Sequence, residues 1–429
     1  MNGQLQKEIP FVPEETESKH QYLLCVGQHI TESSLQNKLA QFDVQVERPC
    51  TVVNMDRDED EHAEYPIKAT VVHLDQRKES ELVQCKYLLG CDGAHSDIRQ
   101  QLGIKNEGET SETHAGVLDA LIRTNFASRK EVCMFPRENG LTRIFVHFNE
   151  NEHELRKEQH NRNKIQVEDI QREAKRALLP HRIEFLGILY WTVYVVGQRY
   201  ASRLNSEDHR VFLCGDAAHS QSPTLGQGVN TGFGDVFNLI WKICMVEKGQ
   251  LNRKFLSTYH SERWFVAQNV LNIDKVAAKA AAGHQAADYC EVVEKNRLFT
   301  SGFGIQYPYD SKEQVSLLWS PDDDKPDEGI DLNSASYVMQ PGMRAPNFKV
   351  FGFKSGKKTR LFDAIAKNDQ LNQAQCHRTY DKKVDGTLAD DEKIHIAVVR
   401  PDGYIGTIVR SDDGTILSDK VCQYFSNIM

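Results

Sequence analysis

A chain of 429 residues, of which 40% are hydrophobic and 26% charged, is long enough to bury a large core and to divide into two or three domains. The formal net charge of −9 and the lack of a long basic run argue against nucleic acid or an anionic membrane as the main partner. The longest apolar run, 186–196, is too short for a bilayer and rich in Tyr, Trp and Thr, which favours a buried strand over a membrane segment.

Neither the first twenty residues nor the cysteines suggest secretion or metal binding. Residues 1–20 are polar and acidic, without a basic-then-apolar signal sequence. The ten cysteines form no C-x-x-C pair, so their spacing indicates neither a metal site nor a dithiol redox centre. We expect reduced thiols in a cytoplasmic protein, with most cysteines acting as small buried hydrophobic residues.

Taken in order, the chain begins with an aperiodic, exposed lead at 1–19. The acidic segment after residue 55 is typical of a solvated hairpin tip. Hydrophobic periodicity then predicts a helix at 29–42, strands at 44–53, 67–74 and 83–93, a helix at 94–102, strands at 142–149 and 186–196, a charged helix at 167–179, a strand at 211–214, and one or two helices within 251–287.

Residues 211–242 combine a short apolar strand, a Gly-rich loop and a helix. Val229, Phe233 and Phe237 recur at four-residue steps, which is helical spacing. Gly226 and Gly228 let the backbone turn sharply, so free N–H groups and the positive end of the helix dipole can face an anionic or electron-rich ligand. The alternative is an ordinary strand–turn–helix in which Asp216 serves as a cap.

The ordered set Gly215-Asp216-Ala217-Ala218-His219, Pro223 and Gly226-Gln227-Gly228-Val229-Asn230 resembles the second FAD fingerprint of the single-component flavoprotein aromatic hydroxylases. That family includes p-hydroxybenzoate hydroxylase and phenol 2-monooxygenase. The resemblance implies that Gly215-Asp216 binds the ribityl chain of FAD. It also implies that the loop places backbone N–H groups near the flavin pyrimidine, through Pro223, Gly226, Gln227, Gly228, Val229 and Asn230.

Two further segments carry the resemblance. The text YLLGCDGAHSDIRQQLG is similar to the family's Asp-Gly motif, which implies that Asp92 and Gly93 lie beside the FAD pyrophosphate and the path of NADPH. Arg99 in this segment either meets a phosphate or is an ordinary helix-surface arginine. Gln28, four residues before Glu32, matches a glutamine that contacts the flavin in the phenol-hydroxylase branch.

The segment FPRENGLTRIFVHF resembles the phenol-hydroxylase run that flanks the phenolic substrate. The resemblance implies a catalytic role for Arg137, with Arg143 and Phe145 in the substrate pocket. The family has Tyr where this chain has Phe145, so one hydrogen bond worth about 0.5–1.5 kcal/mol is lost. The alternative is two exposed strand arginines and one core phenylalanine.

The fold class implied is α/β (α+β) of the p-hydroxybenzoate-hydroxylase type. The sequence contains no G-x-G-x-x-G motif before Asp92, so we expect the FAD-binding domain to be incomplete. The C-terminal domain is expected to be thioredoxin-like without a redox pair, and structural or dimer-forming. The expected domains are a first FAD-binding segment at 1–110, a substrate-binding sheet at 111–199, a second FAD-binding segment with following helices at 200–318, a linker at 319–340 and the thioredoxin-like domain at 341–429.

The function implied is hydroxylation of a phenolic substrate by O₂ with FAD and NADPH as cofactors. Two alternatives stay open at this point. One is a non-catalytic remnant that binds flavin or an aromatic compound and acts in assembly. The other is a related flavin hydroxylase or oxidase with a different substrate.

Overall fold

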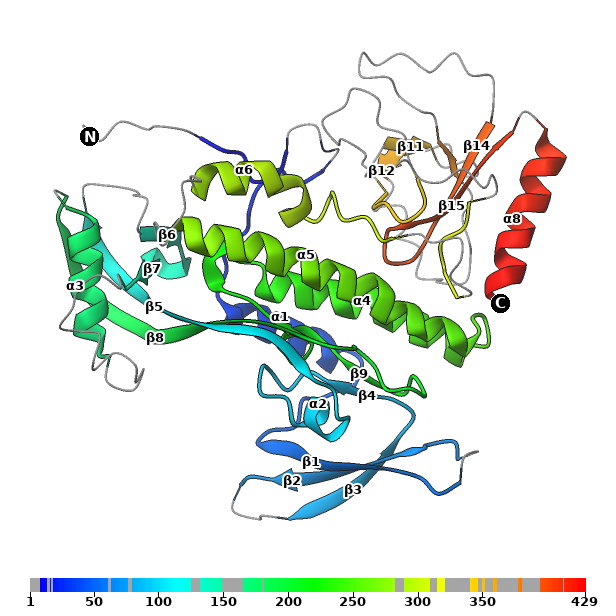
Figure 1. The fold of residues 1–429 in the computed structure, drawn as a ribbon, viewed down its shortest axis with the longest axis horizontal. Helices are drawn as coiled ribbons and strands as arrows, with labels where there is room; N and C mark the ends of the chain where they lie inside the picture. The colour runs from blue at the N-terminus through cyan, green and yellow to red at the C-terminus, as the bar shows by residue number, and fades with distance from the viewer. Residues whose placement is uncertain are drawn as a thin grey trace.

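Two long helices, α4 (Gly228–Glu247) and α5 (Thr258–Ala281), run side by side across the middle of the molecule (Figure 1). Sheets lie below and to the left of them, and a C-terminal unit lies at the upper right. The computed structural model describes residues 8–13, 16, 18–60, 63–75, 79–124, 132–148, 165–179, 181–281, 289–308, 315–320, 340–345, 349–351, 358–360, 377–379, 394–411 and 413–429. In these parts of the chain, no helix is both long enough and apolar enough to span a bilayer.

The largest sheet has five antiparallel strands in the order β10-β8-β5-β7-β6. Helix α3 (Val167–Ala177) covers one face, where Ile170 and Ala174 pack against Leu118 and Ile144. Because each strand alternates its residues between the two faces, one apolar set faces α3. Removing these side chains from water stabilises the sheet. The strands are β5 (Asn106–Thr124), β6 (Val132–Pro136), β7 (Thr142–His147), β8 (Ile183–Ala201) and β10 (His219–Ser220).

A short parallel pair, β4 (Leu88–Gly90) and β9 (Val211–Leu213), lies against α4 and α5. All three residues of β9 are buried, and their core includes Leu239 of α4 and Tyr259 of α5. The carboxyl ends of both strands therefore open at the same edge, where ligands bind in sheets of this kind.

A separate antiparallel sheet of three strands lies at the bottom of Figure 1. Helix α1 (Gln28–Ala40) precedes it, and helix α2 (Asp97–Gln101) follows it in sequence. Arg57 at the end of the first strand pairs with Ile67 at the start of the second, so the acidic segment lies between two antiparallel strands in sequence. The strands are β1 (Cys50–Arg57), β2 (Ile67–His73) and β3 (Ser80–Cys85).

The C-terminal unit consists of β13 (His377–Thr379), β14 (Ile394–Val399), β15 (Ile405–Ser411) and α8 (Gly414–Ile428). Val409, Leu417 and Tyr424 share an apolar core with residues that precede α5. Its thioredoxin-like character stays a prediction, as do the domain boundaries. The remaining α-helix and strands are α6 (Tyr289–Thr300), β11 (Lys349–Phe351) and β12 (Lys358–Arg360).

Several local predictions differ from the structure. The first strand, expected at 44–53, begins only at Cys50 and extends to Arg57. The strand expected at 83–93 is two strands, because β3 pairs antiparallel with β2 whereas β4 pairs parallel with β9. The lead is not wholly exposed, since Val12 is buried. Most cysteines are not buried either: among the eight whose side chains are described, only Cys214 is buried, and four are exposed.

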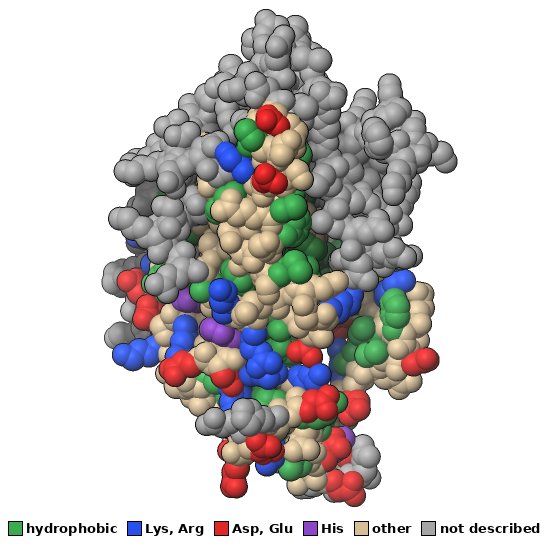
Figure 2. Space-filling view, turned by 90° about the vertical axis from the view of Figure 1, so that its right-hand side faces the viewer, with side chains coloured by type: hydrophobic (Ala, Val, Ile, Leu, Met, Phe, Trp, Pro, Cys, Tyr) green, Lys and Arg blue, Asp and Glu red, His purple; other side chains and the backbone are tan. Residues whose placement is uncertain are grey.

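The described residues on one face of the molecule carry charges of both signs. Figure 2 shows basic side chains lying beside acidic ones on the face at the right of Figure 1. Ion pairs between distant segments include Lys86 with Glu247 at 3.0 Å and Arg57 with Asp208 at 2.9 Å. The described residues of this face therefore form no patch of one sign.

Candidate functional site

The loop that follows β9 turns at two glycines with left-handed backbone. Gly215 has φ of +60° and Gly226 has φ of +64°, and a Cβ added at either would meet nothing within 4 Å. Only glycine adopts this conformation without strain, and the space beside both is open. The loop comprises η3 (Gly215–Ala217), β10 and η4 (Pro223–Leu225) before α4 begins at Gly228.

The second half of the loop is closed by its own hydrogen bonds. The Asn230 side-chain amide donates to the Gly226 carbonyl at 3.0 Å, and the Gln227 carbonyl accepts from the Thr231 N–H at 2.9 Å. Pro223 occupies the start of η4, where its missing N–H costs nothing. The first N–H groups of an α-helix have no partner within the helix, and Val229 in this turn of α4 is exposed.

Gln221 is a residue of this loop that sequence reasoning missed. Neither atom of its side-chain amide has a hydrogen-bond partner among the described residues, although both atoms are buried. Its nitrogen lies 4.0 Å from the position that a Cβ of Gly228 would take. A buried amide without partners is costly, so its place beside the loop fits a ligand that supplies the missing bonds. No periodicity or motif in the sequence distinguishes Gln221 from its neighbours.

The turn after β4 is joined to this loop by Arg99. Gly93 has φ of +84°, and the Asp92 carboxylate accepts from the N–H of Ile98 at 3.1 Å. Arg99 is buried and donates to the carbonyls of Ala217 and Ala94, both at 2.9 Å. Burial lowers the pKa of its guanidinium. Arg99 is therefore not a surface arginine, and these two hydrogen bonds connect the Asp-Gly turn to the Gly-Asp turn.

Asp235 of α4 holds the first turn of the loop in place. Its carboxylate accepts from the Gly215 N–H at 2.9 Å and pairs with His219 and Arg263, both at 2.8 Å. Complete burial acts to raise the pKa of Asp235, but His219 and Arg263 outweigh burial and lower it. The carboxylate thus stays charged and holds Gly215 in place.

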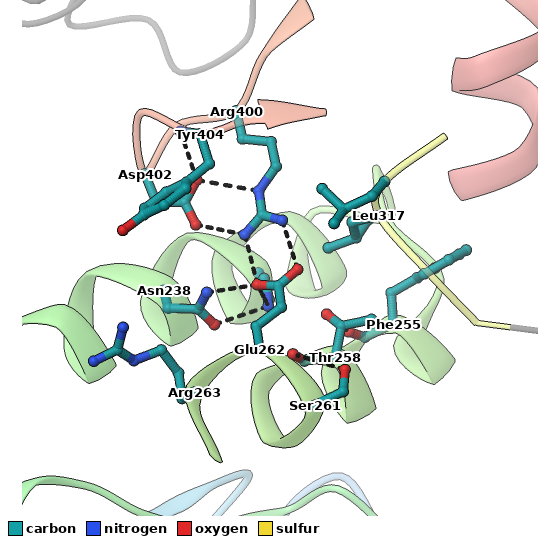
Figure 3. A network of polar contacts seen from close by, with 12 residues as sticks. Asn238, Phe255, Thr258, Ser261, Glu262, Arg263, Leu317, Arg400, Asp402 and Tyr404 are labelled. Carbon is teal, nitrogen blue, oxygen red and sulfur yellow. Dashed lines mark hydrogen bonds and ion pairs between the residues drawn. The ribbon is translucent and has the colours of Figure 1, made fainter. Parts of the chain in front are cut away.

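A second buried network is centred on Glu262, the residue of α5 directly before Arg263 (Figure 3). Glu262 accepts from Arg400 of the β14–β15 turn at 2.6 and 2.7 Å, from Lys242 at 3.0 Å and from Asn238 at 2.6 Å. Arg400 also pairs with Asp402. Burial acts to raise the pKa of Glu262, but Arg400 and Lys242 bring it down to about 2. The network joins α4, α5 and the C-terminal unit.

The two arginines predicted near the substrate meet on one carboxylate. Arg143 donates to Asp119 at 2.7 and 2.8 Å, and Arg137 donates to Asp119 at 3.3 Å and to Glu138 at 3.0 Å. The side chains of Arg137 and Asp119 are only 6% and 7% exposed, so the alternative of two exposed strand arginines is wrong for Arg137. Asp119 was missed, although a carboxylate within the apolar strand 115–122 is a usable signal.

Aromatic residues share the face of the sheet that carries Asp119. Phe145 of β7 pairs with Val117 of β5, and Tyr190 of β8 pairs with Asp119 of β5. Burial raises the pKa of the Tyr194 hydroxyl, and the neighbouring Tyr190 raises it further. Sequence reasoning missed both tyrosines, although their two-step spacing along a strand would have placed them on one face.

The start of α1 lies against this arginine cluster. Gly27 is packed so closely that a Cβ there would come within 2.8 Å of Arg137 and 2.5 Å of Glu138. The adjacent Gln28 is exposed and is the first residue of the helix. The structure therefore brings Gln28 near Arg137, whereas the Asp-Gly turn is joined to the loop after β9.

The arrangement has the fold of the p-hydroxybenzoate hydroxylase type, as the sequence predicted. OxyS anhydrotetracycline hydroxylase from Streptomyces rimosus superposes with a TM-score of 0.68 at 22% identity, over 98% of this chain and 83% of that chain. A ternary complex of aklavinone-11 hydroxylase with FAD and aklavinone gives a TM-score of 0.64 at 20% identity, over 93% and 78%. These similarities establish the fold.

The chain belongs to the FAD binding domain family, whose model matches residues 3–274. It is 31% identical over 323 residues to the FAD-dependent monooxygenase terD of Aspergillus terreus, covering 70% of this chain and 48% of that protein. It is 32% identical over 277 residues to the 3-hydroxybenzoate 4-monooxygenase of Comamonas testosteroni, covering 57% and 43%. The chain spans about half the length of the curated relatives it matches.

Proposed function

We propose that this chain carries the flavin and substrate regions of an FAD-dependent monooxygenase that hydroxylates a phenolic compound with O₂ and NADPH. The observation that carries the proposal is the loop after β9, which has open space beside Gly215 and Gly226 and an unpartnered Gln221 amide 4.0 Å from the Cβ position of Gly228. This loop lies within the residues that match the FAD binding domain family. The residues present therefore fit the group.

In this proposal, FAD is held by side-chain and backbone groups of the two turns. Asp216 is exposed at the first turn, where its carboxylate accepts hydrogen bonds from the ribityl hydroxyls. The free N–H groups at the start of α4, from Gly228 to Asn230, favour negative charge on the pyrimidine side of the ring. Asp92 and Gly93 belong to the pyrophosphate side. When bound, FAD would supply the redox chemistry that activates O₂ with electrons from NADPH.

The face of the five-stranded sheet that holds Asp119 is proposed to orient the phenol. Arg143 is 22% exposed at its side chain, more than Arg137, and is the better placed of the two to reach a bound hydroxyl. Arg137 is proposed to act by holding Asp119 and the start of α1. Phe145 offers apolar contact, and the hydroxyls of Tyr190 and Tyr194 lie on the neighbouring strand where a phenol could hydrogen-bond them.

The proposal is tested by adding FAD to the purified chain and recording its visible spectrum and its NADPH oxidation with and without phenol. We expect bound flavin absorbance and phenol-stimulated oxidation. A chain that takes up no FAD would contradict the proposal. Flavin uptake without stimulated oxidation would favour the non-catalytic alternative, and stimulation only by other aromatic compounds would favour a different substrate.

Two glycines with the same backbone conformation allow the role of the loop in FAD binding to be distinguished from the effect of backbone strain. Gly226 and Gly249 have φ of +64° and +67°, and neither would bring a Cβ within 4 Å of another group. Alanine at either position carries a similar strain of about 1 kcal/mol or more. Gly226→Ala is expected to weaken FAD binding at least tenfold, whereas Gly249→Ala, beyond the far end of α4, leaves it unchanged. Equal effects would show that the loop is not the flavin site.

A further inference from the structure

Two cysteines that are far apart in sequence follow directly on the two strands of the parallel pair. Strands β4 and β9 pair in register as Leu88 with Val211 and Gly90 with Leu213. The Cys214 N–H donates to the Gly90 carbonyl at 3.0 Å, so the pairing continues to the next residues, Cys91 and Cys214. Neighbouring strands are about 4.8 Å apart, and in-register side chains point to the same side. This spacing falls in the range of about 4.4–6.8 Å that a disulfide needs between Cα atoms.

The two thiols interact with each other and differ in their surroundings. Cys91 is exposed, whereas Cys214 is 2% exposed, with the Tyr259 hydroxyl 3.3 Å from its sulfur. The hydrogen bond from Cys214 lowers the pKa of the Cys91 thiol, and the same contact, followed by burial, raises the pKa of Cys214. An accessible thiol whose pKa is lowered, in contact with a buried thiol whose pKa is raised, is typical of a redox-sensitive pair.

We propose that Cys91 and Cys214 form a reversible disulfide when the protein meets hydrogen peroxide. The Cys91 thiolate attacks one peroxide oxygen, the O–O bond breaks, and hydroxide leaves and takes up a proton to become water, giving a sulfenic acid. The Cys214 sulfur then attacks the Cys91 sulfur, the S–O bond breaks, and a second water leaves with the Cys214 proton. Two thiols are oxidised by two electrons, and one peroxide is reduced to two waters.

The disulfide would tie together the two turns that surround the glycine loop. Cys91 precedes Asp92-Gly93, and Cys214 precedes Gly215-Asp216. Arg99 already connects these turns through the Ala217 carbonyl. A covalent bond at this edge would restrict their separation, so oxidation would change the affinity of the loop for FAD. This last consequence rests on the proposed function, whereas formation of the disulfide does not.

The test treats the native chain with a small excess of hydrogen peroxide, blocks free thiols with N-ethylmaleimide and digests without reduction. Mass spectrometry should find a peptide pair joined through Cys91 and Cys214, two hydrogens lighter than the sum, that dithiothreitol separates. Titration of the unfolded chain should find two fewer thiols than the ten of the reduced chain. Oxidation of Cys91 to sulfinic acid without any joined peptide would overturn the proposal.

Variants make the assignment specific. In Cys91→Ser, the buried Cys214 should stay reduced under the same treatment, and serine at an exposed position keeps the fold. In Cys214→Ser, Cys91 should stop at sulfenic acid, which dimedone traps. Cys422→Ser, at an exposed position of α8, should leave the joined peptide at its wild-type yield. A joined peptide that includes Cys214 in Cys91→Ser would contradict the pairing. Failure of the reduced chain to bind FAD would instead contradict the proposed function.

Discussion

The two faces of α4 invert the usual arrangement of an amphipathic helix. One face is buried although it carries Asp235, Asn238 and Lys242, whose relative exposures are 0%, 1% and 0%. The other face is apolar yet exposed, with Phe237 at 70% and Val229 at 52%. The comparison teaches that hydrophobic spacing located this helix correctly but did not reveal which face is buried. The inward face can bury these polar side chains because each has hydrogen-bond or ion-pair partners that replace water.

The largest effect should come from breaking the pair between Glu262 and Arg400. Arg400→Met leaves the Glu262 carboxylate buried with Lys242 and Asn238 alone, which should cost about 3–5 kcal/mol in the free energy of unfolding. Urea unfolding measures this. The control is Arg123→Met, because the pair of Arg123 with Glu184 is exposed at 73% and 60% and contributes about 0–1 kcal/mol. Equal losses in the two variants would show that the buried pair contributes no more to the free energy of unfolding than an exposed pair does.

Stability should fall in acid because of Glu262. Its pKa in the folded chain is about 2, below the ordinary 4.5, so its contribution is fully present above about pH 5. The contribution is lost as the pH falls from about 5 to about 2, and it amounts to about 3 kcal/mol. Urea unfolding at several pH values checks this. Glu262→Gln should have a flatter profile over this range, and an unchanged slope would contradict the assignment.

A smaller effect is expected from Asp235→Asn, which keeps an acceptor for the Gly215 N–H but removes the charge that faces Arg263. Loss of this charge-assisted bonding should cost about 1–3 kcal/mol in unfolding free energy. If Asp235 positions the loop, FAD affinity measured by fluorescence should also fall, even at a temperature where the variant is fully folded. Stability loss with unchanged FAD affinity would limit Asp235 to a structural role.

The smallest effect should come from the apolar, exposed face. Phe237→Ser should change the free energy of unfolding by no more than about 0.5 kcal/mol, because Phe237 is 70% exposed. The matched variant is Leu239→Ala on the same helix, where full burial predicts a loss of about 2–5 kcal/mol. Chemical unfolding of both variants compares them. A large loss in Phe237→Ser would mean that this face is covered in the folded protein.

Much of the local structure could be predicted from the sequence. The helix α3 and the strands β2, β7 and β9 lie where periodicity placed them, because each has an apolar pattern of helix or strand type. Helix α1 also forms where it was expected, although none of its residues is buried. Of the two glycines expected to turn the backbone sharply, Gly226 has left-handed φ, whereas Gly228 is the first residue of α4; Gly215, for which no such turn was expected, is also left-handed. The FAD binding domain family and the hydroxylase fold followed from the same residues.

Other features were decided only by tertiary structure. Spacing in the sequence indicated no dithiol, yet parallel pairing of β4 with β9 brings Cys91 next to Cys214. Likewise, no local pattern relates Arg400 to Glu262 or Asp119 to Arg143. Local sequence determines backbone conformation through sterics and hydrophobic periodicity, which act over a few residues. Which charges and thiols meet depends on how distant elements pack, and only the folded chain determines that.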